Sequence, residues 1–261
     1  MVVALVTSST QGVGRAIALR LADDGFDVAV NDLPSRASIL EVLVCEIALK
    51  GRRSCAVLGD ASSEVDVQEM ISSTVEELGP LDVMVANAGV CIMKSILSTS
   101  SEEWDRIAAI NSYDTSLCHK YAAQQMKDQG REIRIIGASS VAGKRGSPIS
   151  AACRSSKFSA HDIGAPKFGR YGVTINAYAP APTDTEMLVG IGDTLMGDWK
   201  RAHEKKDRSG ASADIASMVS YLASKEAHFA VTGHLNVMYQ SYETLIFLSF
   251  QMSVNEGSWY K

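Results

Sequence analysis

Apolar residues along the chain alternate between two kinds of segment. Short runs rich in β-branched residues are typical of parallel strands that are covered on both faces. They occupy Val2–Val6, Asp27–Asn31, Ser54–Leu58, Leu81–Ala86, Ile133–Ile136 and Val173–Tyr178. Between them lie longer segments with apolar residues at helical spacing, at Val13–Ala22, Ser38–Lys50, Val65–Leu78, Glu102–Met126, Ala151–Phe168 and Asp214–Ala223.

A strand followed by a helix, repeated six times, predicts βαβ units with right-handed crossovers. Ser100 followed by Glu103 adds a capping box at the start of the fourth helix. We therefore expect an α/β fold: a Rossmann-like, doubly wound parallel sheet with helices on both faces. No linker, repeat or low-complexity stretch interrupts the pattern, so a single domain is expected over residues 1–261.

Length and composition narrow the class of protein. A chain of 261 residues and 28.0 kDa suits one α/β domain with a core large enough to be stable without disulfides. Hydrophobic residues make up 46% and charged residues 21%, which are globular values and argue against disorder. A net charge of −5 argues against a nucleic-acid partner. The late apolar run Leu245–Phe250 is too short to span a membrane, so no membrane partner is expected.

The cysteines and histidines show no metal-binding pattern. The five cysteines form no CxxC pair and no zinc spacing, and the five histidines are equally scattered, so we expect no metal. An odd number of widely spaced cysteines favours reduced thiols. The first residues, Met1 to Val6, have neither the basic region nor the cleavage site of a signal peptide. We therefore expect a cytoplasmic protein.

The loop after the first predicted strand carries two glycines. In doubly wound sheets, ligands bind beyond the carboxyl ends of the strands. Gly12 and Gly14 open a helix directly behind the strand. A glycine lets the backbone approach a pyrophosphate, and the helix N-terminus offers free N–H groups. Two glycines alone are equally compatible with a tight strand–helix turn.

The next three strands are also followed by polar residues. Asp32 ends the second strand, where a carboxylate can accept hydrogen bonds from both ribose hydroxyls. Asp60 follows the third strand and Asn87-Ala88-Gly89 the fourth. Each of these has an alternative interpretation as turn chemistry. Together with the glycines, their position at the ends of four successive strands favours a dinucleotide site.

With these motifs the chain resembles the short-chain dehydrogenase/reductase family, from about Val2 to about Val237. The family's Thr-Gly-x-x-x-Gly-x-Gly motif matches at Thr7, Gly12 and Gly14, with Ser8 in place of the first glycine. Its Asn-Asn-Ala-Gly motif is present as Ala86-Asn87-Ala88-Gly89, and its last strand as Thr232–Val237, which gives about seven strands. The local pattern is similar to that of acetoin- and diol-type dehydrogenases.

The resemblance implies a bound NAD or NADP. Asp60 then holds the adenine ring, while the Thr183 backbone and the Thr185 side chain meet the nicotinamide amide. A carboxylate at Asp32 repels a 2′-phosphate and favours NAD, whereas Arg36 could pair with that phosphate; we favour NAD slightly. The implied cofactor contacts are Thr7, Ser9, Gln11, Gly12, Val13, Gly14, Asp32, Asp60, Ala61, Asn87, Ala88, Gly89, Lys157, Pro180, Thr183 and Thr185.

The family's catalytic set is an Asn, a Ser and a Tyr-x-x-x-Lys on one helix. The resemblance places Asn111, Ser140 and Lys157 in these roles, but the Tyr position holds Cys153. In members that keep the set, Tyr gives or takes the substrate proton. Lys lowers the pKa of the phenol and holds the ribose, Ser hydrogen-bonds the carbonyl oxygen, and Asn supports a water leading to Lys.

Cys153 alters the expected chemistry. It shares a helix face with Lys157, whose ammonium favours a thiolate. A thiol is a weak donor and ends several Å short of a phenol's hydroxyl, so the general acid is missing or displaced. Positioned acid–base catalysis is worth roughly 10²–10⁴ in rate, and ordinary carbonyl reduction should be impaired accordingly. Alternatively, Cys153 is a small helix residue without chemistry, and a water or Tyr113 supplies the proton.

Three functions remain open. The first is an NAD(P)-dependent oxidoreductase that transfers hydride between nicotinamide and a hydroxyl, carbonyl or imine of a small molecule. The second is a biosynthetic cyclase of the Diels–Alder type or an iminium reductase, neither of which needs the acid. The third is a redox-inactive binding protein.

The resemblance also predicts how the chain is assembled. It implies a homotetramer or homodimer through the helices that bear Asn111 and Cys153–Lys157. It further implies a substrate lid at residues 186–208. Residues 239–261 depart from the family and form an atypical C-terminal tail.

Overall fold

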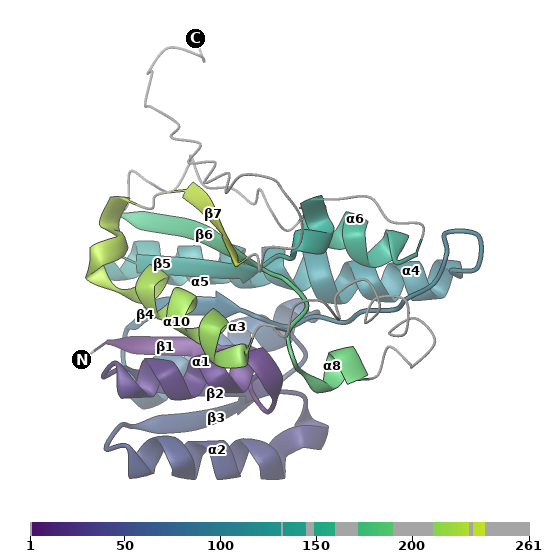
Figure 1. Ribbon diagram of the computed structural model, residues 1–261. Coiled ribbons are helices and arrows are strands. Elements are labelled where there is room, and N and C mark those ends of the chain that lie inside the picture. Colours follow the sequence, from purple (N-terminus) through teal and green to yellow (C-terminus); the bar gives the residue numbers. More distant parts are fainter. Residues whose placement is uncertain are drawn as a thin grey trace.

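The computed structural model describes residues 2–131, 133–144, 149–159, 172–189, 211–229 and 232–237. These residues form a parallel sheet between two layers of helices (Figure 1). The strands are β1 (Val3–Val6), β2 (Asp27–Asp32), β3 (Ser54–Leu58), β4 (Leu81–Ala86), β5 (Ile133–Ala138), β6 (Val173–Pro180) and β7 (Thr232–Val237). Their order across the sheet is β3-β2-β1-β4-β5-β6-β7, and all six neighbouring pairs are parallel.

This topology confirms the predicted doubly wound fold. The strand order reverses beside β1, which pairs with β2 on one side and β4 on the other. The crevice for ligands in such a sheet lies at the carboxyl ends of the strands, beside this reversal. The loops that carry most of the predicted cofactor contacts leave from that edge, whereas Asn111, Cys153 and Lys157 lie on helices.

Helices cover both faces of the sheet, as the continuous apolar runs predict. The helices are α1 (Gly12–Asp23), α2 (Ala37–Leu49), α3 (Glu64–Leu78), α4 (Ser101–Ala108), α5 (Asp114–Gln129), α6 (Ala151–Ser159), α8 (Glu186–Val189) and α10 (Ser212–Ala223). Along β1, Ala4 and Val6 pack with residues of α1, α2 and α10, while Val3 and Leu5 pack with residues of α3 and α5. The core is thus divided by the sheet into two apolar layers.

The long helix expected over Glu102–Met126 is not a single α-helix. The capping box of Ser100 and Glu103 starts α4 as predicted, but residues Ala109–Tyr113 form a π-helical turn between α4 and α5. A π turn leaves apolar spacing almost unchanged over so short a stretch, so periodicity alone does not reveal it. Its consequence is local: it places Asn111 in the interior with no exposed surface.

Several predicted features lie outside the described residues. The sixth-strand loop leads into α8, which covers the first residues of the predicted lid, and the rest of residues 186–208 lies outside the described ranges. The same holds for the end of the helix predicted to Phe168 and for the tail at 239–261. Within the described ranges, no helix is long and apolar enough to cross a membrane.

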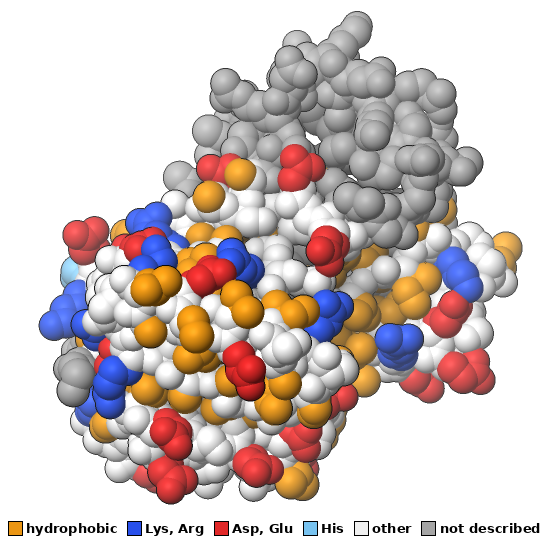
Figure 2. Space-filling view, turned by 90° about the horizontal axis from the view of Figure 1, so that it is seen from below, with side chains coloured by type: hydrophobic (Ala, Val, Ile, Leu, Met, Phe, Trp, Pro, Cys, Tyr) orange, Lys and Arg blue, Asp and Glu red, His pale blue; other side chains and the backbone are white. Residues whose placement is uncertain are grey.

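Helix α2 carries apolar side chains on its exposed face as well as on its buried face. Ile39, Val42 and Leu49 are exposed, while Leu40 and Leu43 reach the core. Viewed from below, hydrophobic side chains lie between acidic ones on the surface of the molecule (Figure 2). The apolar residues of this segment therefore predict a helix but do not show which face of the helix is buried.

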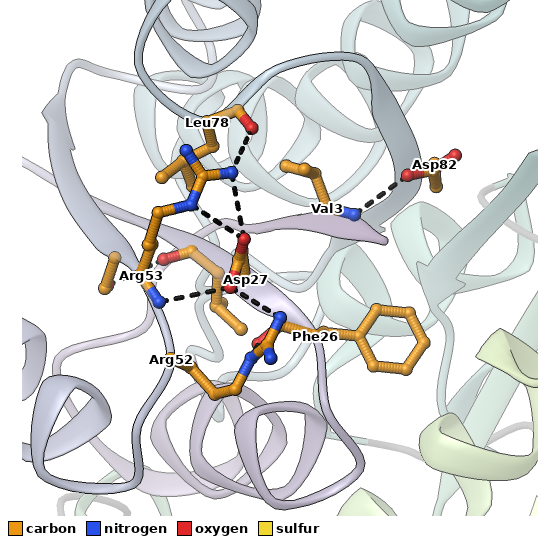
Figure 3. A network of polar contacts seen from close by, with 9 residues as sticks. Val3, Phe26, Asp27, Arg52, Arg53, Leu78 and Asp82 are labelled. Atoms are coloured by element: carbon orange, nitrogen blue, oxygen red, sulfur yellow. Dashed lines mark hydrogen bonds and ion pairs between the residues drawn. The ribbon is translucent and has the colours of Figure 1, made fainter. Parts of the chain in front are cut away.

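A buried charge network ties the strands together at their amino ends (Figure 3). Asp27, whose side chain is 2% exposed, pairs with Arg52 at 2.7 Å and Arg53 at 2.9 Å. Arg53 also donates to the Leu78 carbonyl, and Arg52 donates to that of Phe26. Burial alone raises the pKa of Asp27, but the hydrogen bonds from Arg53 and the charges of both arginines outweigh it and lower the pKa.

Asp27→Asn is expected to lower the free energy of unfolding by about 3 kcal/mol at pH 7, because it removes one partner of a buried ion network. The folded-state pKa of Asp27 lies below its unfolded value of about 3.9. Its stabilisation is therefore present above that value and is lost as pH falls through the folded pKa. Urea unfolding at pH 7 and at about pH 3 measures both effects, and the gap between variant and parent should narrow in acid.

The matched control for this variant is Asp23→Asn. Asp23 pairs with Lys50 at 2.6 Å, but its side chain is 53% exposed. Exposed ion pairs contribute about 0–1 kcal/mol. If Asp27→Asn lowers the free energy of unfolding no more than Asp23→Asn does, the result would contradict a stabilising role for the buried network.

Candidate functional site

The loops after β1 and β4 are joined by hydrogen bonds. The Thr7 hydroxyl accepts from the backbone N–H groups of Asn87 at 2.9 Å and Ala88 at 3.2 Å. In return, the Asn87 side-chain amide donates to the backbone carbonyls of Thr7 at 3.0 Å and Ser8 at 3.2 Å. These two predicted motifs therefore form one rigid unit at the reversal of strand order.

Tyr178 orients this unit from a third strand. Near the carboxyl end of β6, its hydroxyl donates to Asn87 Oδ1 at 2.8 Å. The side chain is 1% exposed, and burial raises its pKa, so the phenol stays neutral. Tyr178 was not among the predicted site residues. A tyrosine in an otherwise apolar buried strand is a usable signal, because a buried phenol needs a polar partner.

The glycine loop has no room for larger side chains at Gly14. A Cβ atom there would lie 2.3 Å from the Ser8 carbonyl oxygen and 2.5 Å from Asn87 Nδ2. Gly12 has a positive φ of 53°, and a Cβ on it would lie 3.3 Å from the Thr185 methyl carbon. The loop after β6, which carries Thr183 and Thr185, thus reaches the glycine loop.

Ser8 occupies a backbone position that favours glycine. Its φ is 51°, in the left-handed region. A residue with a Cβ pays roughly 1–2 kcal/mol in that conformation. The family motif has glycine at this position, and the conformation of Ser8 gives the physical reason.

The carboxylate of Asp32 is directed toward the glycine loop. Its Oδ2 accepts from Thr10 through both the backbone N–H, at 3.2 Å, and the hydroxyl, at 2.5 Å. Ser9 is held beside it, since both its N–H and its hydroxyl donate to the Asn31 carbonyl. Asp32 is thus a positioned negative charge at the end of β2.

The two nearby arginines differ in their surroundings. Arg15, one residue after Gly14 in α1, donates to Glu46 of α2 at 2.6 Å. Its charge is therefore already balanced within the fold. Arg36 ends the short 3-10 turn that precedes α2, and it is exposed.

The remaining predicted cofactor contacts line the same edge. Asp60 lies beyond the end of β3, and its Oδ1 accepts from the N–H and hydroxyl of Ser62 in a turn. Ala61 is buried next to it. Gln11 precedes α1 with no side-chain cap, Val13 lies in the first turn of α1, and Pro180 ends β6.

Asn111 and Lys157 meet beside Gly89. A Cβ on Gly89 would lie 3.2 Å from Lys157 Nζ and 3.3 Å from Asn111 Oδ1. Lys157 donates to the Ala138 carbonyl at 2.8 Å, and burial lowers the pKa of its ammonium. Asn111 binds the backbone of Val90, accepting from its N–H at 2.8 Å and donating to its carbonyl at 2.9 Å.

Ser140 makes its described contacts with the backbone. Its hydroxyl accepts from the Ala142 N–H at 3.1 Å and lies 3.5 Å from the Pro180 carbonyl. The preceding Ser139 donates to the Lys157 carbonyl at 3.0 Å. The loop after β5 therefore touches both the end of β6 and α6.

Cys153 faces the loop after β4. Its Sγ accepts from the Ile92 N–H at 3.0 Å, and its side chain packs with Ile107 in a small apolar cluster. A hydrogen bond from the Cys91 thiol, the Ile92 N–H and the charge of Lys157 together outweigh burial and lower the pKa of Cys153 to about 7. The sulfur is thus held against the loop after β4, four residues before Lys157 on α6.

Tyr113, the alternative proton donor, lies at the surface. It is 51% exposed and lies two residues after the buried Asn111. Residues two apart on a helix point to different faces. Ser112 between them donates to the Ser156 carbonyl of α6. The exposure of Tyr113 argues against it as the proton donor beside Lys157.

The same motifs and fold recur in known proteins. Residues 7–238 match the model of a family described as enoyl-(acyl carrier protein) reductase. A short-chain dehydrogenase/reductase of Armillaria gallica is 45% identical over 245 residues, covering 90% of this chain and 94% of the relative. The chain belongs to the short-chain dehydrogenase/reductase family. It is therefore an NAD(P)-dependent oxidoreductase that acts on small molecules.

Two further relatives bear on substrate and cofactor. A diacetyl reductase [(S)-acetoin forming] of Staphylococcus epidermidis is 33% identical, covering 88% of this chain and 94% of the relative. A short-chain dehydrogenase of Mycobacterium paratuberculosis solved with NAD has a TM-score of 0.81 at 27% identity, covering 90% of this chain and 96% of that one. The resemblance to the family, and to its acetoin-type members, is thus confirmed.

One buried group of this short-chain dehydrogenase/reductase was missed at the level of sequence. Asp114 begins α5, one turn after Asn111 on the same helix face, and it is fully buried. Its Oδ1 accepts from Thr115, and its Oδ2 has no hydrogen-bond partner among the described residues. Burial raises the pKa of Asp114 to about 7, against the opposing charge of Lys157 and the hydrogen bonds from Thr115. An acidic residue on the helix face that bears Asn111 is the signal that could have found it.

Asp114→Asn is expected to gain stability relative to the parent as pH rises. The folded pKa of about 7 lies above the unfolded value of about 3.9. The cost of ionising Asp114 is therefore absent below the unfolded pKa, grows between the two values and is constant above the folded one. The full difference corresponds to about 4 kcal/mol. Urea unfolding at pH 5 and pH 8 should measure about 3 kcal/mol of it, because part of the cost is already present at pH 5.

The variant should also lose about 1–3 kcal/mol of free energy of unfolding at every pH, because the new amide nitrogen is buried without an acceptor. The test is therefore the change between the two pH values rather than either value alone. Asp105→Asn, an exposed position on α4, serves as the control and should show no such change. A pH-independent effect of Asp114→Asn would show that Asp114 titrates normally.

Proposed function

We propose that this protein transfers a hydride between NAD(H) and a hydroxyl, carbonyl or imine carbon of a small molecule, with altered acid–base chemistry. The observation that carries the proposal is a contrast between the two ends of the site. The nucleotide end has a closely fitted glycine loop and a positioned carboxylate at Asp32. The chemical end keeps Asn111 and Lys157, but the residue four before Lys157 is Cys153, whose sulfur is bonded to Ile92.

The residues at the nucleotide end fit a dinucleotide. The side-chain-free cradle at Gly14 and the uncapped first turn of α1 leave backbone N–H groups for a pyrophosphate. In this proposal Asp32 binds the adenosine ribose, Asp60 and Ala61 hold the adenine, and Lys157 holds the nicotinamide ribose. The other proposed contacts are Thr7, Ser9, Gln11, Gly12, Val13, Asn87, Ala88, Gly89, Pro180, Thr183 and Thr185. When bound, the cofactor supplies or accepts the hydride.

The charges near Asp32 favour NAD over NADP. The oriented carboxylate places a negative charge where a 2′-phosphate would be bound. Arg15 is paired with Glu46, so only Arg36 is placed to compensate. The relative that was solved with NAD supports the same choice.

A titration of the protein with NADH and with NADPH, followed by fluorescence transfer from protein to nicotinamide, tests this proposal. We expect NADH to bind at least about tenfold more tightly, which corresponds to about 1.4 kcal/mol. Asp32→Ala should reduce the difference, whereas the exposed Asp24→Ala at the end of α1 should leave it unchanged. Equal affinities in the parent protein would contradict the preference for NAD, and binding of neither cofactor would contradict the proposed activity.

The chemical end favours acceptors that need little protonation. Lys157 provides a buried ammonium, and Asn111 fixes the loop beside it through Val90. The residue four before Lys157 is Cys153 and not a tyrosine, so in this proposal a ketone lacks the proton donor that the family's catalytic set would supply. An iminium carbon already carries the positive charge that the acid would create. We therefore expect the ratio of imine to ketone reduction to exceed that of relatives with the full catalytic set.

The assembly proposed for this chain rests on the same helices. Tyr113, at the π turn before α5, is 51% exposed, and Phe158 on α6 is 68% exposed. Large apolar side chains on neighbouring exposed positions are typical of subunit contacts. They support the proposal of a homodimer or homotetramer through α5 and α6. The single domain over 1–261, the lid at 186–208 and the atypical tail at 239–261 remain proposals.

A further inference from the structure

Two cysteines from distant parts of the chain meet beside the proposed site. Cys91 lies in the loop after β4, and Cys153 lies on α6. The Cys153 sulfur is 3.0 Å from the nitrogen and 3.5 Å from the oxygen of Ile92, and 4.0 Å from the oxygen of Val90. It therefore contacts the residues on both sides of Cys91. Cys91 also packs against the apolar cluster that contains Cys153.

The surroundings make the two sulfurs chemically unequal. The Cys91 thiol, whose Sγ lies 3.8 Å from Met93 Sδ, also acts on the Cys153 sulfur, and this interaction, with the Ile92 N–H and the Lys157 charge, lowers the pKa of Cys153 to about 7. The pKa of Cys91 is raised by the same interaction and by burial, although Arg154 and Lys157 oppose the increase. Cys153, whose sulfur accepts from the Ile92 N–H, is thus the more acidic and more nucleophilic of the two, and Cys91 is the thiol that packs beside it.

The other buried thiols lack this arrangement. Burial and the charge of Glu77 raise the pKa of Cys55 to about 11, and burial raises that of Cys118. Cys45 is exposed on α2, on the other side of β1 from the proposed site. A thiolate beside a second thiol is the arrangement that oxidises reversibly.

We propose that Cys91 and Cys153 are an oxidisable dithiol, which a hydroperoxide converts into a disulfide. The Cys153 thiolate attacks one peroxide oxygen: an S–O bond forms, the O–O bond breaks, and the leaving hydroxide takes a proton to become water. The Cys91 sulfur then attacks the sulfenic sulfur of Cys153. The S–S bond forms, the S–O bond breaks, and hydroxide leaves with the proton of Cys91 as a second water. Two thiols are oxidised and one peroxide is reduced.

The burial of Cys153 selects the oxidant. Cys153 is 4% exposed, so a bulky disulfide such as oxidised glutathione cannot reach its sulfur. Hydrogen peroxide is little larger than water and can. The product would link the loop after β4 to α6. The Val90 N–H in that loop donates to Asn111, and α6 carries Lys157. The disulfide would therefore link the loop that binds Asn111 to the helix that carries Lys157. This inference concerns a modification of the protein and does not depend on the proposed hydride transfer.

Treatment of the reduced full-length protein with hydrogen peroxide, followed by alkylation, digestion and mass spectrometry, tests it. We expect a linked peptide pair containing Cys91 and Cys153, a loss of two of the five reactive thiols, and full recovery with dithiothreitol. The initial rate of linkage should rise with pH and reach half its maximum near pH 7, as the thiolate of Cys153 forms.

Two variants separate the proposed pair from general oxidation. Cys91→Ser should give no linkage and should leave Cys153 to accumulate as sulfinic acid, because no thiol is present to resolve the sulfenic acid. Cys45→Ser is the matched control and should form the disulfide at the parental rate. Oxidation of Cys45, Cys55 or Cys118 while Cys91 and Cys153 stay reduced would overturn the proposal. This comparison of the five cysteines needs only the parent protein, so the proposal can still be tested if Cys91→Ser does not fold.

Discussion

Cys153→Tyr is expected to increase the rate of ketone reduction by about 10²–10⁴, the range in which a positioned general acid contributes. The new phenol would stand four residues before Lys157, on the same helix face, where the buried ammonium favours its ionised form. Removing the sulfur also frees the Ile92 N–H, which now donates to it. The measurement is kcat/KM for NADH-dependent reduction of diacetyl, a small ketone suggested by the diacetyl reductase relative.

Cys153→Phe is the matched control for this gain. It has nearly the same volume as the tyrosine variant but no hydroxyl, so it should disturb the cluster with Ile107 and Ala152 equally and gain no activity. Equal gains in both variants would attribute the effect to packing. A tyrosine variant that binds NADH normally yet reduces no ketone faster would contradict the view that Cys153 limits ketone reduction.

Gly14→Ala is expected to weaken NADH binding by about 10–100-fold and to lower the free energy of unfolding by about 1–3 kcal/mol. The added methyl would lie 2.3 Å from the Ser8 carbonyl oxygen and 2.5 Å from Asn87 Nδ2, neither of which can move alone. Both atoms belong to the hydrogen-bonded unit that joins the loops after β1 and β4. NADH titration and urea unfolding measure the two effects.

Ser8→Gly is the control within the same loop. It removes a side chain from a residue with a φ of 51°, so it relieves about 1 kcal/mol of backbone strain and leaves the cradle at Gly14 open. We expect it to bind NADH as well as the parent protein does. Gly14→Ala binding NADH with parental affinity would show that the pyrophosphate does not approach this part of the loop.

Local patterns in the sequence determined the fold and the location of the nucleotide end. The alternation of buried strands and helices depends on residues close in sequence, so six of the strands and most of the helices were predicted to within a few residues. The pair of glycines before α1 and the acid at the end of β2 are likewise local signals, because each reports what one turn of backbone needs. These residues were predicted as a site without any knowledge of their contacts.

Only the tertiary structure decided how the chemical end is built. Four features involve groups whose surroundings come from other strands and helices. They are the hydrogen bond from Tyr178 to Asn87, the π turn that contains the buried Asn111, the Asp114 oxygen that has no hydrogen-bond partner among the described residues, and the contact between Cys153 and the Cys91 loop. Burial and pKa depend on all the atoms around a group, which periodicity in one segment does not describe. The sequence therefore determined only that Cys153 stands four residues before Lys157, whereas the packing of the loop after β4 against α6 decided what its sulfur touches.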